Sequence, residues 1–176
     1  RAAFTPPVTP ERHLLHGTRF AARPMKCKVL RNYKSFYMES EIMKKIGIIN
    51  APISSVIAHL EHSDMLTVAD AGLPVPSSTQ RIDLTLKPGV PGFLETLEVV
   101  LSEMFVEKAY VSEDILTKSP HIYAGIQKLL GDVPIETLPH AEFKARTGLT
   151  KAIIRTAEFT PFANVILVAG AWGFKL

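Results

Sequence analysis

From residue 46 onward, hydrophobic residues follow two alternating kinds of spacing. Short apolar runs predict strands, and apolar residues three or four positions apart predict the helices between them. The first helix carries Ile53, Val56, Ile57 and Leu60 on one face, after a proline at a position that suits a helix start. The predicted strands cover residues 46–49, 65–69, 81–86, 106–112, 133–138, 152–157 and 164–170, and the predicted helices begin at Pro52, Pro91, Pro120 and Pro139.

This alternation of strands and helices indicates the fold class. A strand that is followed by a helix usually returns to the same sheet, which leaves helices on both faces. The last two predicted strands are almost continuously apolar, as interior strands are. Residues 43–176 show no internal repeat and no convincing linker. We therefore predict a single α/β domain, a three-layer α/β/α sandwich with a largely parallel or mixed sheet.

Residues 1–42 differ from this body in pattern and in charge. They have neither helical nor alternating spacing, contain four prolines, and hold 8 Lys and Arg against 3 Asp and Glu, a net charge of +5. The body holds 12 against 14, a net charge of −2. We interpret residues 1–42 as a non-native or disordered leader and Met43 as the natural start of the protein.

Charge and composition exclude several classes of function. The formal net charge of +3 comes from the leader, so the body has no basic surface that predicts a nucleic-acid partner. No run reaches the roughly 18 apolar residues of a membrane span, which predicts a cytoplasmic protein with no membrane partner. The one cysteine, Cys27, lies in the leader, and the body has no glycine-rich phosphate loop or HExxH motif. We expect no metal and no cofactor.

Several polar residues fall at the ends of predicted strands. In open α/β sheets, ligands bind beyond the carboxyl ends of the strands. Asp70, His140 and the segment 158–164, which includes Asn164, have such positions. His62 instead precedes a strand, so its relation to the other three depends on the fold.

Each of these residues also has a purely structural interpretation. His62 would cap the C-terminus of a helix, where a positive charge is favourable. Asp70 would form an Asx turn that leads into Gly72. His140 would be a surface residue at a helix start, and Asn164 a turn residue before the final strand. Spacing alone leaves these alternatives open.

Five segments taken together resemble the ribose pyranase / fucose mutarotase family. They are HSD (62–64), DAGLPVP (70–76), RIDL (81–84), PHAEF (139–143) and IRTAEFTPFANVILVAG (154–170). The resemblance runs from Met43 to about Phe174. It implies a cofactor-free isomerase that interconverts the pyranose and furanose forms of a free monosaccharide, and DAGLPVP favours the ribose branch and hence D-ribose. It also implies a ring-like homo-oligomer with sites near subunit contacts.

The same resemblance implies roles for individual residues. His62 matches the proton-donating histidine, Asp70 and His140 match sugar-binding residues, and Phe162-Ala163-Asn164 matches a contact segment. The chemistry suits them, because opening a sugar ring needs a proton delivered to the ring oxygen and another removed from the anomeric hydroxyl. A histidine, which titrates near neutral pH, can do both.

Two residues depart from the family pattern. Glu61 stands where the family has glycine and places a carboxylate beside His62, which favours the protonated ring. Phe162 replaces a tyrosine, so a hydroxyl is missing. If that hydroxyl binds sugar, affinity or preference changes; if the backbone makes the contact, little changes. The competing functions are a mutarotase for another sugar such as fucose, and a non-catalytic sugar-binding module of ribose uptake.

Overall fold

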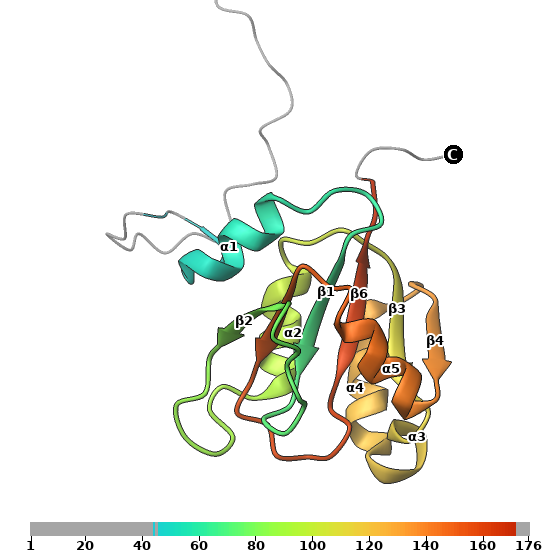
Figure 1. Ribbon diagram of the computed structural model, residues 1–176. Coiled ribbons are helices and arrows are strands. Elements are labelled where there is room, and N and C mark those ends of the chain that lie inside the picture. The colour runs from blue at the N-terminus through green and yellow to red at the C-terminus, as the bar shows by residue number, and fades with distance from the viewer. Residues whose placement is uncertain (1–43, 45, 172–176) are drawn as a thin grey trace, which may run out of the picture. The chain divides into compact units, whose positions relative to one another are not determined.

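The computed structural model describes residue 44 and residues 46–171, where a six-stranded sheet lies between helices (Figure 1). The predicted α/β fold is therefore confirmed. The predicted leader, residues 1–42, and Met43 lie outside the described residues. The strands are β1 (Met65–Ala69), β2 (Gln80–Asp83), β3 (Val106–Ser112), β4 (Ile135–Leu138), β5 (Ala152–Arg155) and β6 (Val165–Ala169). The helices are α1 (Ala51–Ala58), α2 (Phe93–Leu101), α3 (Ile115–Lys118), α4 (Pro120–Leu130) and α5 (His140–Thr147).

The sheet is mixed because one strand, β6, is antiparallel to its neighbours. The strand order is β2-β5-β1-β6-β3-β4. β6 runs antiparallel to both of its neighbours, β1 and β3, whereas the other neighbouring pairs are parallel. Five strands therefore point the same way and β6 points the opposite way. The amino end of β6 consequently lies at the same edge of the sheet as the carboxyl ends of the other five.

The two faces of the sheet are covered unequally. Side chains from α2 and α4, such as Leu97 and Ile126, pack with Ile154 on one face in the larger core cluster. On the opposite face, Phe143 of α5 packs against Ile153 in a smaller cluster. Adjacent residues of β5 thus serve opposite faces, as the pleat of a strand requires. In Figure 1, α5 lies in front of the sheet, and α2 and α4 lie behind it.

The predicted strand at 46–49 is wrong. Ile48 is buried in the core, but its neighbours Ile46 and Ile49 are exposed. Gly47 has a φ of 76°, in the left-handed region, which interrupts an extended run. The N–H of Ile48 donates to the carboxylate of Glu103 rather than to another strand. The segment anchors one side chain without joining the sheet.

Other differences lie at the ends of elements. β2 ends at Asp83 rather than at residue 86, because the Asp83 carboxylate accepts hydrogen bonds from Thr85 N (3.0 Å) and Thr85 Oγ1 (2.6 Å) and so forms a turn. α2 begins at Phe93, with Gly92 at the cap position, rather than at Pro91. The four-residue helix α3 was not predicted. Within the described residues, no helix combines the length and apolar character needed to cross a membrane.

Candidate active site

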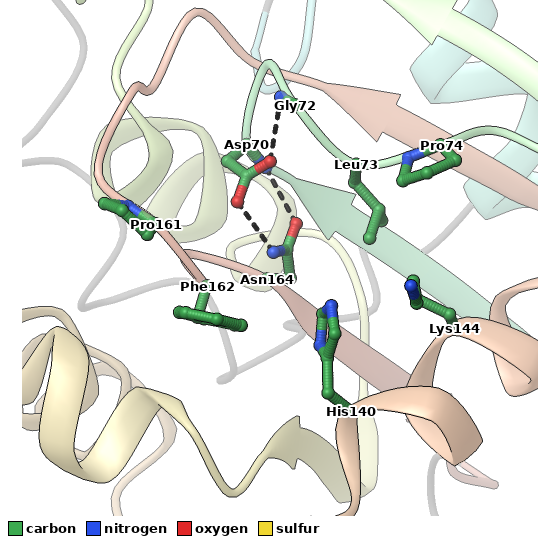
Figure 2. Close-up of a pocket in the computed structure, with 9 residues that line it drawn as sticks. All are labelled: Asp70, Gly72, Leu73, Pro74, His140, Lys144, Pro161, Phe162 and Asn164. Carbon is green, nitrogen blue, oxygen red and sulfur yellow. Dashed lines mark hydrogen bonds between the residues drawn. The ribbon is translucent and has the colours of Figure 1, made fainter.

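Side chains from three parts of the chain meet at the edge where β1 and β4 end and β6 begins. Asp70 follows β1, His140 opens α5 directly after β4, and Asn164 precedes β6. They line an open pocket of about 240 Å³ (Figure 2), below the roughly 300–1,000 Å³ typical of drug-sized ligands. Its size and polar groups suit a small polar molecule. The lining residues are Asp70, Gly72, Leu73, Pro74, His140, Lys144, Pro161, Phe162 and Asn164.

Asp70 and Asn164 hold each other in place through two hydrogen bonds. Asn164 Nδ2 donates to Asp70 Oδ2 at 2.8 Å, and the backbone N–H of Asp70 donates to Asn164 Oδ1 at 2.9 Å. Asp70 is 7% exposed and Asn164 is 3% exposed. Because both ends of the Asn164 amide are used, its orientation is determined, and the Asp70 carboxylate is held rigidly at the pocket wall.

Burial raises the pKa of the Asp70 carboxyl above its ordinary value. The hydrogen bonds from Asn164, Gly72 and Leu73 and the charge of His140 act in the opposite direction, but they do not cancel the loss of solvation. A carboxylate that is costly to ionise gains from any ligand hydroxyl that donates to it. The pocket therefore contains a strong hydrogen-bond acceptor.

The structural interpretation of Asp70 is also correct as local geometry. Its Oδ1 accepts a hydrogen bond from Gly72 N at 2.9 Å, which is the predicted Asx turn. The two interpretations are compatible because the carboxylate has two oxygen atoms. One oxygen shapes the turn, and the other pairs with Asn164 beside the pocket.

His140 and Phe162 form the opposite side of the pocket. Their rings meet edge to face, with centroids 5.0 Å apart and an interplanar angle of 81°. The Nδ1 atom of His140 is buried and has no hydrogen-bond partner among the described residues. A buried polar atom of this kind is costly unless a ligand or water satisfies it. The buried Nδ1 atom does not fit the alternative interpretation, in which His140 is only a surface residue.

The predicted contact segment is only partly in the pocket. Phe162 has a φ of 61°, and its carbonyl accepts a hydrogen bond from Asn164 N at 2.8 Å, so the backbone turns sharply there. The turn brings Phe162 and Asn164 to the pocket, whereas the side chain of Ala163 is fully buried in the core. A contact between Ala163 and a ligand would have to involve its backbone.

Lys144 lines the pocket but was not among the predicted site residues. It lies four residues after His140 on α5, and residues four apart share one face of a helix. The spacing in PHAEFK contains this signal once His140 is accepted as a site residue. Lys144 adds a cationic hydrogen-bond donor to a pocket that already offers a carboxylate acceptor.

The RIDL and IRT motifs hold the loop that follows Asp70. Arg155 donates to the carbonyl of Ala71 from Nε (3.1 Å) and Nη2 (2.9 Å), and its Nη1 donates to Asp83 Oδ2 at 2.9 Å. Hydrogen bonds from Thr85, with a smaller contribution from Arg155, lower the pKa of Asp83 to about 2. The N–H of Ala71 donates to the carbonyl of Glu158 at 2.8 Å. The loop is therefore fixed from β2 and β5.

The structure places His62 away from this pocket. His62 lies in the turn before β1, whereas Asp70 follows the last residue of that strand. The five residues of β1, at about 3.3 Å each, separate the two positions by roughly 16 Å. The residue at the cap position of α1 is His59, so the capping interpretation of His62 is wrong. Four of the six predicted site residues, Asp70, His140, Phe162 and Asn164, thus line the pocket, and the side chains of His62 and Ala163 do not.

A carboxylate does contact His62, but it does not come from Glu61. Glu107 of β3 places its Oε2 atom 2.9 Å from Nε2 of His62. Glu61 instead uses its backbone N–H to bind Asp64 Oδ2 at 2.9 Å. In the part of the chain that the structure describes, no group of three or more His, Cys, Asp or Glu side chains is arranged to hold a metal ion.

The fold and the pocket define a small α/β domain with a recess for a small polar ligand where most of its strands end. The chain belongs to the RbsD / FucU transport protein family, whose family model matches residues 43–172. Among its relatives, the D-ribose pyranase of Laribacter hongkongensis is 51% identical over 128 residues, which cover 73% of this chain and 98% of that protein. The D-ribose pyranase of Lactobacillus gasseri is 49% identical with the same coverage.

Two solved structures are similar in fold. Bacillus subtilis RbsD complexed with D-ribose is 46% identical, with a TM-score of 0.72, over 73% of this chain and 98% of that chain. The fucose mutarotase from Streptococcus pneumoniae in complex with L-fucose has a TM-score of 0.61 over 70% of this chain and 94% of that chain. At 21% identity, the second comparison supports the fold alone.

The raised pKa of Asp70 predicts a pH-dependent stability difference. The folded state binds a proton here more tightly than the unfolded chain, whose aspartate titrates near 3.8. Binding of this proton adds to the free energy of unfolding below that pH, and the contribution is lost as the pH rises through the pKa that Asp70 has in the folded protein. At pH 7, Asp70→Asn should therefore melt a few degrees above the parent, and the gain should vanish below pH 3.8. Thermal melts across this range measure it. A parent that is the more stable protein at pH 7 would show that the hydrogen bonds to the carboxylate outweigh its burial.

The Arg155 clamp predicts a local effect on the loop. Lysine retains the charge but lacks the planar fork that joins Ala71 to Asp83, so Arg155→Lys should release the loop. Hydrogen exchange of the Ala71 amide should become about 10-fold faster or more, which corresponds to the loss of roughly 1.4 kcal/mol of local protection. Arg146→Lys, in the Arg146–Glu142 surface pair on α5 (3.0 Å), is the matched control and should leave that amide unchanged. Equal protection in both variants would mean that the turn at Asp70 holds the loop without the clamp.

Proposed function

We propose that this protein is an isomerase that interconverts the pyranose and furanose forms of D-ribose without a cofactor. The observation that carries the proposal is the buried Nδ1 of His140, which has no hydrogen-bond partner in the described part of the chain and lies in a pocket that also presents the Asp70 carboxylate. The hydroxyl groups of a free sugar can donate to one and accept from the other. The D-ribose pyranase relatives, and the 46% identical RbsD that binds D-ribose, support ribose as the sugar.

The apolar part of the pocket fits a sugar as well. Leu73, Pro74, Pro161 and Phe162 add carbon surface around the polar groups, and a sugar ring has C–H groups between its hydroxyls. Phe162 lacks the hydroxyl of the family's tyrosine but keeps the aromatic ring against His140. On this proposal, Phe162 contributes ring surface and backbone atoms rather than a side-chain hydrogen bond.

The reaction needs only proton transfers and one rotation of the open chain. A protonated His62 gives its proton to the ring oxygen, and the C1–O bond breaks with its electron pair left on that oxygen. The anomeric hydroxyl loses its proton to the Asp70 carboxylate or to water, which leaves an aldehyde. A different hydroxyl then adds to the aldehyde carbon, gives its proton to the neutral imidazole, and the carbonyl oxygen regains a proton. Asp70, His140 and Asn164 orient the hydroxyls.

His62 reaches the substrate, on this proposal, from a second copy of the chain. It is 59% exposed and lies at the opposite edge of the sheet, so it cannot enter the pocket of its own chain without unfolding β1. Phe105, just before β3 at the same edge, is 53% exposed, and a neighbouring chain bound there would remove this aromatic ring from water. A homo-oligomer, ring-like as expected, would cover Phe105 and deliver His62 to a neighbouring pocket. The cytoplasmic location stays a prediction.

The first test removes the proton donor. His62→Gln keeps the approximate size and hydrogen-bonding capacity of the side chain but cannot cycle a proton near neutral pH. Exchange between pyranose and furanose signals of D-ribose, measured by saturation-transfer NMR, should fall about 10²–10⁴-fold, while ribose affinity by calorimetry stays close to that of the parent. The control is His121→Gln, an exposed histidine on α4, which should exchange ribose normally.

Each other outcome has a distinct meaning. A parent protein that binds ribose without exchange would be a sugar-binding module. Exchange of another free sugar, such as fucose, but not of ribose would make the protein a mutarotase of different specificity. Normal exchange by His62→Gln would move the proton donor elsewhere, with His140 the next candidate.

The second test asks whether sites are shared between chains. His62→Gln and Asp70→Asn, each nearly inactive alone, are mixed under conditions that allow subunits to exchange. A site that combines an intact pocket with an intact His62 from another chain should then form, and up to about a quarter of the parent rate should return by random assortment. If His62 served the pocket of its own chain, every chain would carry one defect and mixing would restore nothing.

A further inference from the structure

The turn that carries His62 is held in one conformation. Ser63 has a φ of 70°, in the left-handed region that few residues other than glycine adopt. Hydrogen bonds to β6 maintain it: Ser63 N donates to Ala169 O, and Ala169 N donates to Asp64 O, both at 2.8 Å. Lys151 Nζ pairs with Asp64 Oδ1 at 3.2 Å. His62 therefore extends from a rigid support.

Glu107 is the residue that fixes the ring of His62 itself. Its Oε2 atom lies 2.9 Å from Nε2 of His62, and the side chain is 39% exposed. The space beside Glu107 is kept open by Gly170, where an added Cβ atom would lie 3.0 Å from Glu107 Cβ and 2.7 Å from Phe105 Cδ1. A residue with a side chain at 170 would displace Phe105, Glu107 or both.

The Asp64 carboxylate, two residues after His62, is already engaged. The Asp64 carboxylate accepts from Glu61 N and pairs with Lys151, and these contacts hold its pKa below the ordinary range. Glu61 belongs to the same turn. Among the described residues, the carboxylate in contact with the His62 ring is that of Glu107, and Nδ1 of His62 has no hydrogen-bond partner. The two ring nitrogens thus have different environments.

We propose that Glu107 is a positioning residue that keeps a proton on Nε2 of His62 and so makes Nδ1 the atom that exchanges protons with the sugar. The inference rests on the proposed function. A carboxylate only accepts hydrogen bonds, so it favours the tautomer with the proton on Nε2 when the ring is neutral. The Nδ1–H of the charged imidazole gives its proton to the ring oxygen of the sugar. The other proton stays on Nε2, which remains hydrogen-bonded to the Glu107 carboxylate.

The geometry also explains how an exposed histidine can act with precision. A free imidazole on a surface rotates and populates both tautomers, and only one tautomer can accept a proton at the atom that faces the substrate. A carboxylate on the far nitrogen removes both freedoms, in the way that a buried aspartate orients the histidine of a serine-protease triad. Glu107 does not itself take up a proton at any step.

The test reads the tautomer and the rate separately. Glu107→Gln has the same shape, but its amide can accept from Nε2–H or donate to a bare Nε2, so the preference should be lost. The ¹⁵N shifts of the His62 ring, assigned by their disappearance in His62→Gln, should show a proton on Nε2 in the parent at alkaline pH and a mixture of tautomers in Glu107→Gln. The ribose exchange rate should fall about 10-fold, with ribose affinity unchanged.

The control is Glu136→Gln, which removes a carboxylate from a surface pair of the same length, Lys108–Glu136 at 2.9 Å, on the neighbouring strand β4. It should leave the ring shifts and the exchange rate as in the parent. Unchanged His62 shifts in Glu107→Gln would overturn the inference, as would equal losses of exchange in Glu107→Gln and Glu136→Gln. The tautomer does not depend on turnover, so this result is distinguishable from a failure of the proposed function, in which His62→Gln exchanges ribose normally.

Discussion

The direction of one strand determines what the rest of this molecule can do. If β6 ran parallel to its neighbours, its amino end would lie at the edge where β1 begins, and Asn164 would be far from Asp70. Because β6 is reversed, the chain enters it at the pocket edge and leaves it beside the turn of His62. The same strand therefore supplies the partner of the pocket carboxylate at one end and the support of the histidine at the other.

Much of the motif that identifies the family supports the site rather than forming it. Asp83 and Arg155 lie outside the pocket lining. Arg155 nevertheless donates to the carbonyl of Ala71 while its other end is paired with Asp83, and it thereby holds the loop that begins at Asp70. Asn164 plays both parts, since it lines the pocket and orients Asp70. Burial of the carboxylate costs the fold some stability, as is common where a site needs a desolvated charged group.

The sequence predicted what depends on local pattern and missed what depends on distant partners. The strand at 106–112 was predicted with its observed bounds, because alternation over seven residues is a strong local signal. The apolar run at 46–49 has an equally strand-like pattern. The N–H of Ile48, however, donates a hydrogen bond to the side chain of Glu103, more than fifty residues away, instead of to another strand. The pairing of Asp70 with Asn164 and the contact of Glu107 with His62 depend on strand order, which spacing does not encode.

The resemblance of five segments to a known family identified residues that composition and spacing had left undecided. It did not reveal that His62 lies away from the pocket, because residues that are close in sequence need not be close in the folded structure. His62 and Asp70 are only eight positions apart, and the extended strand between them separates them by the full length of that strand. Lys144 shows the opposite case, since a helix keeps it beside His140.

The separation of His62 from the pocket has a consequence for the protein in a cell. On the proposed arrangement, each chain takes part in two reaction centres, offering its pocket to one neighbour and its histidine to another. The total activity would then depend on how much protein is assembled and not on how much is folded. At low concentration the chains would be folded but inactive. A gene copy with a damaged histidine would also lower the output of an undamaged copy, because its product would occupy the neighbour's place without supplying a proton.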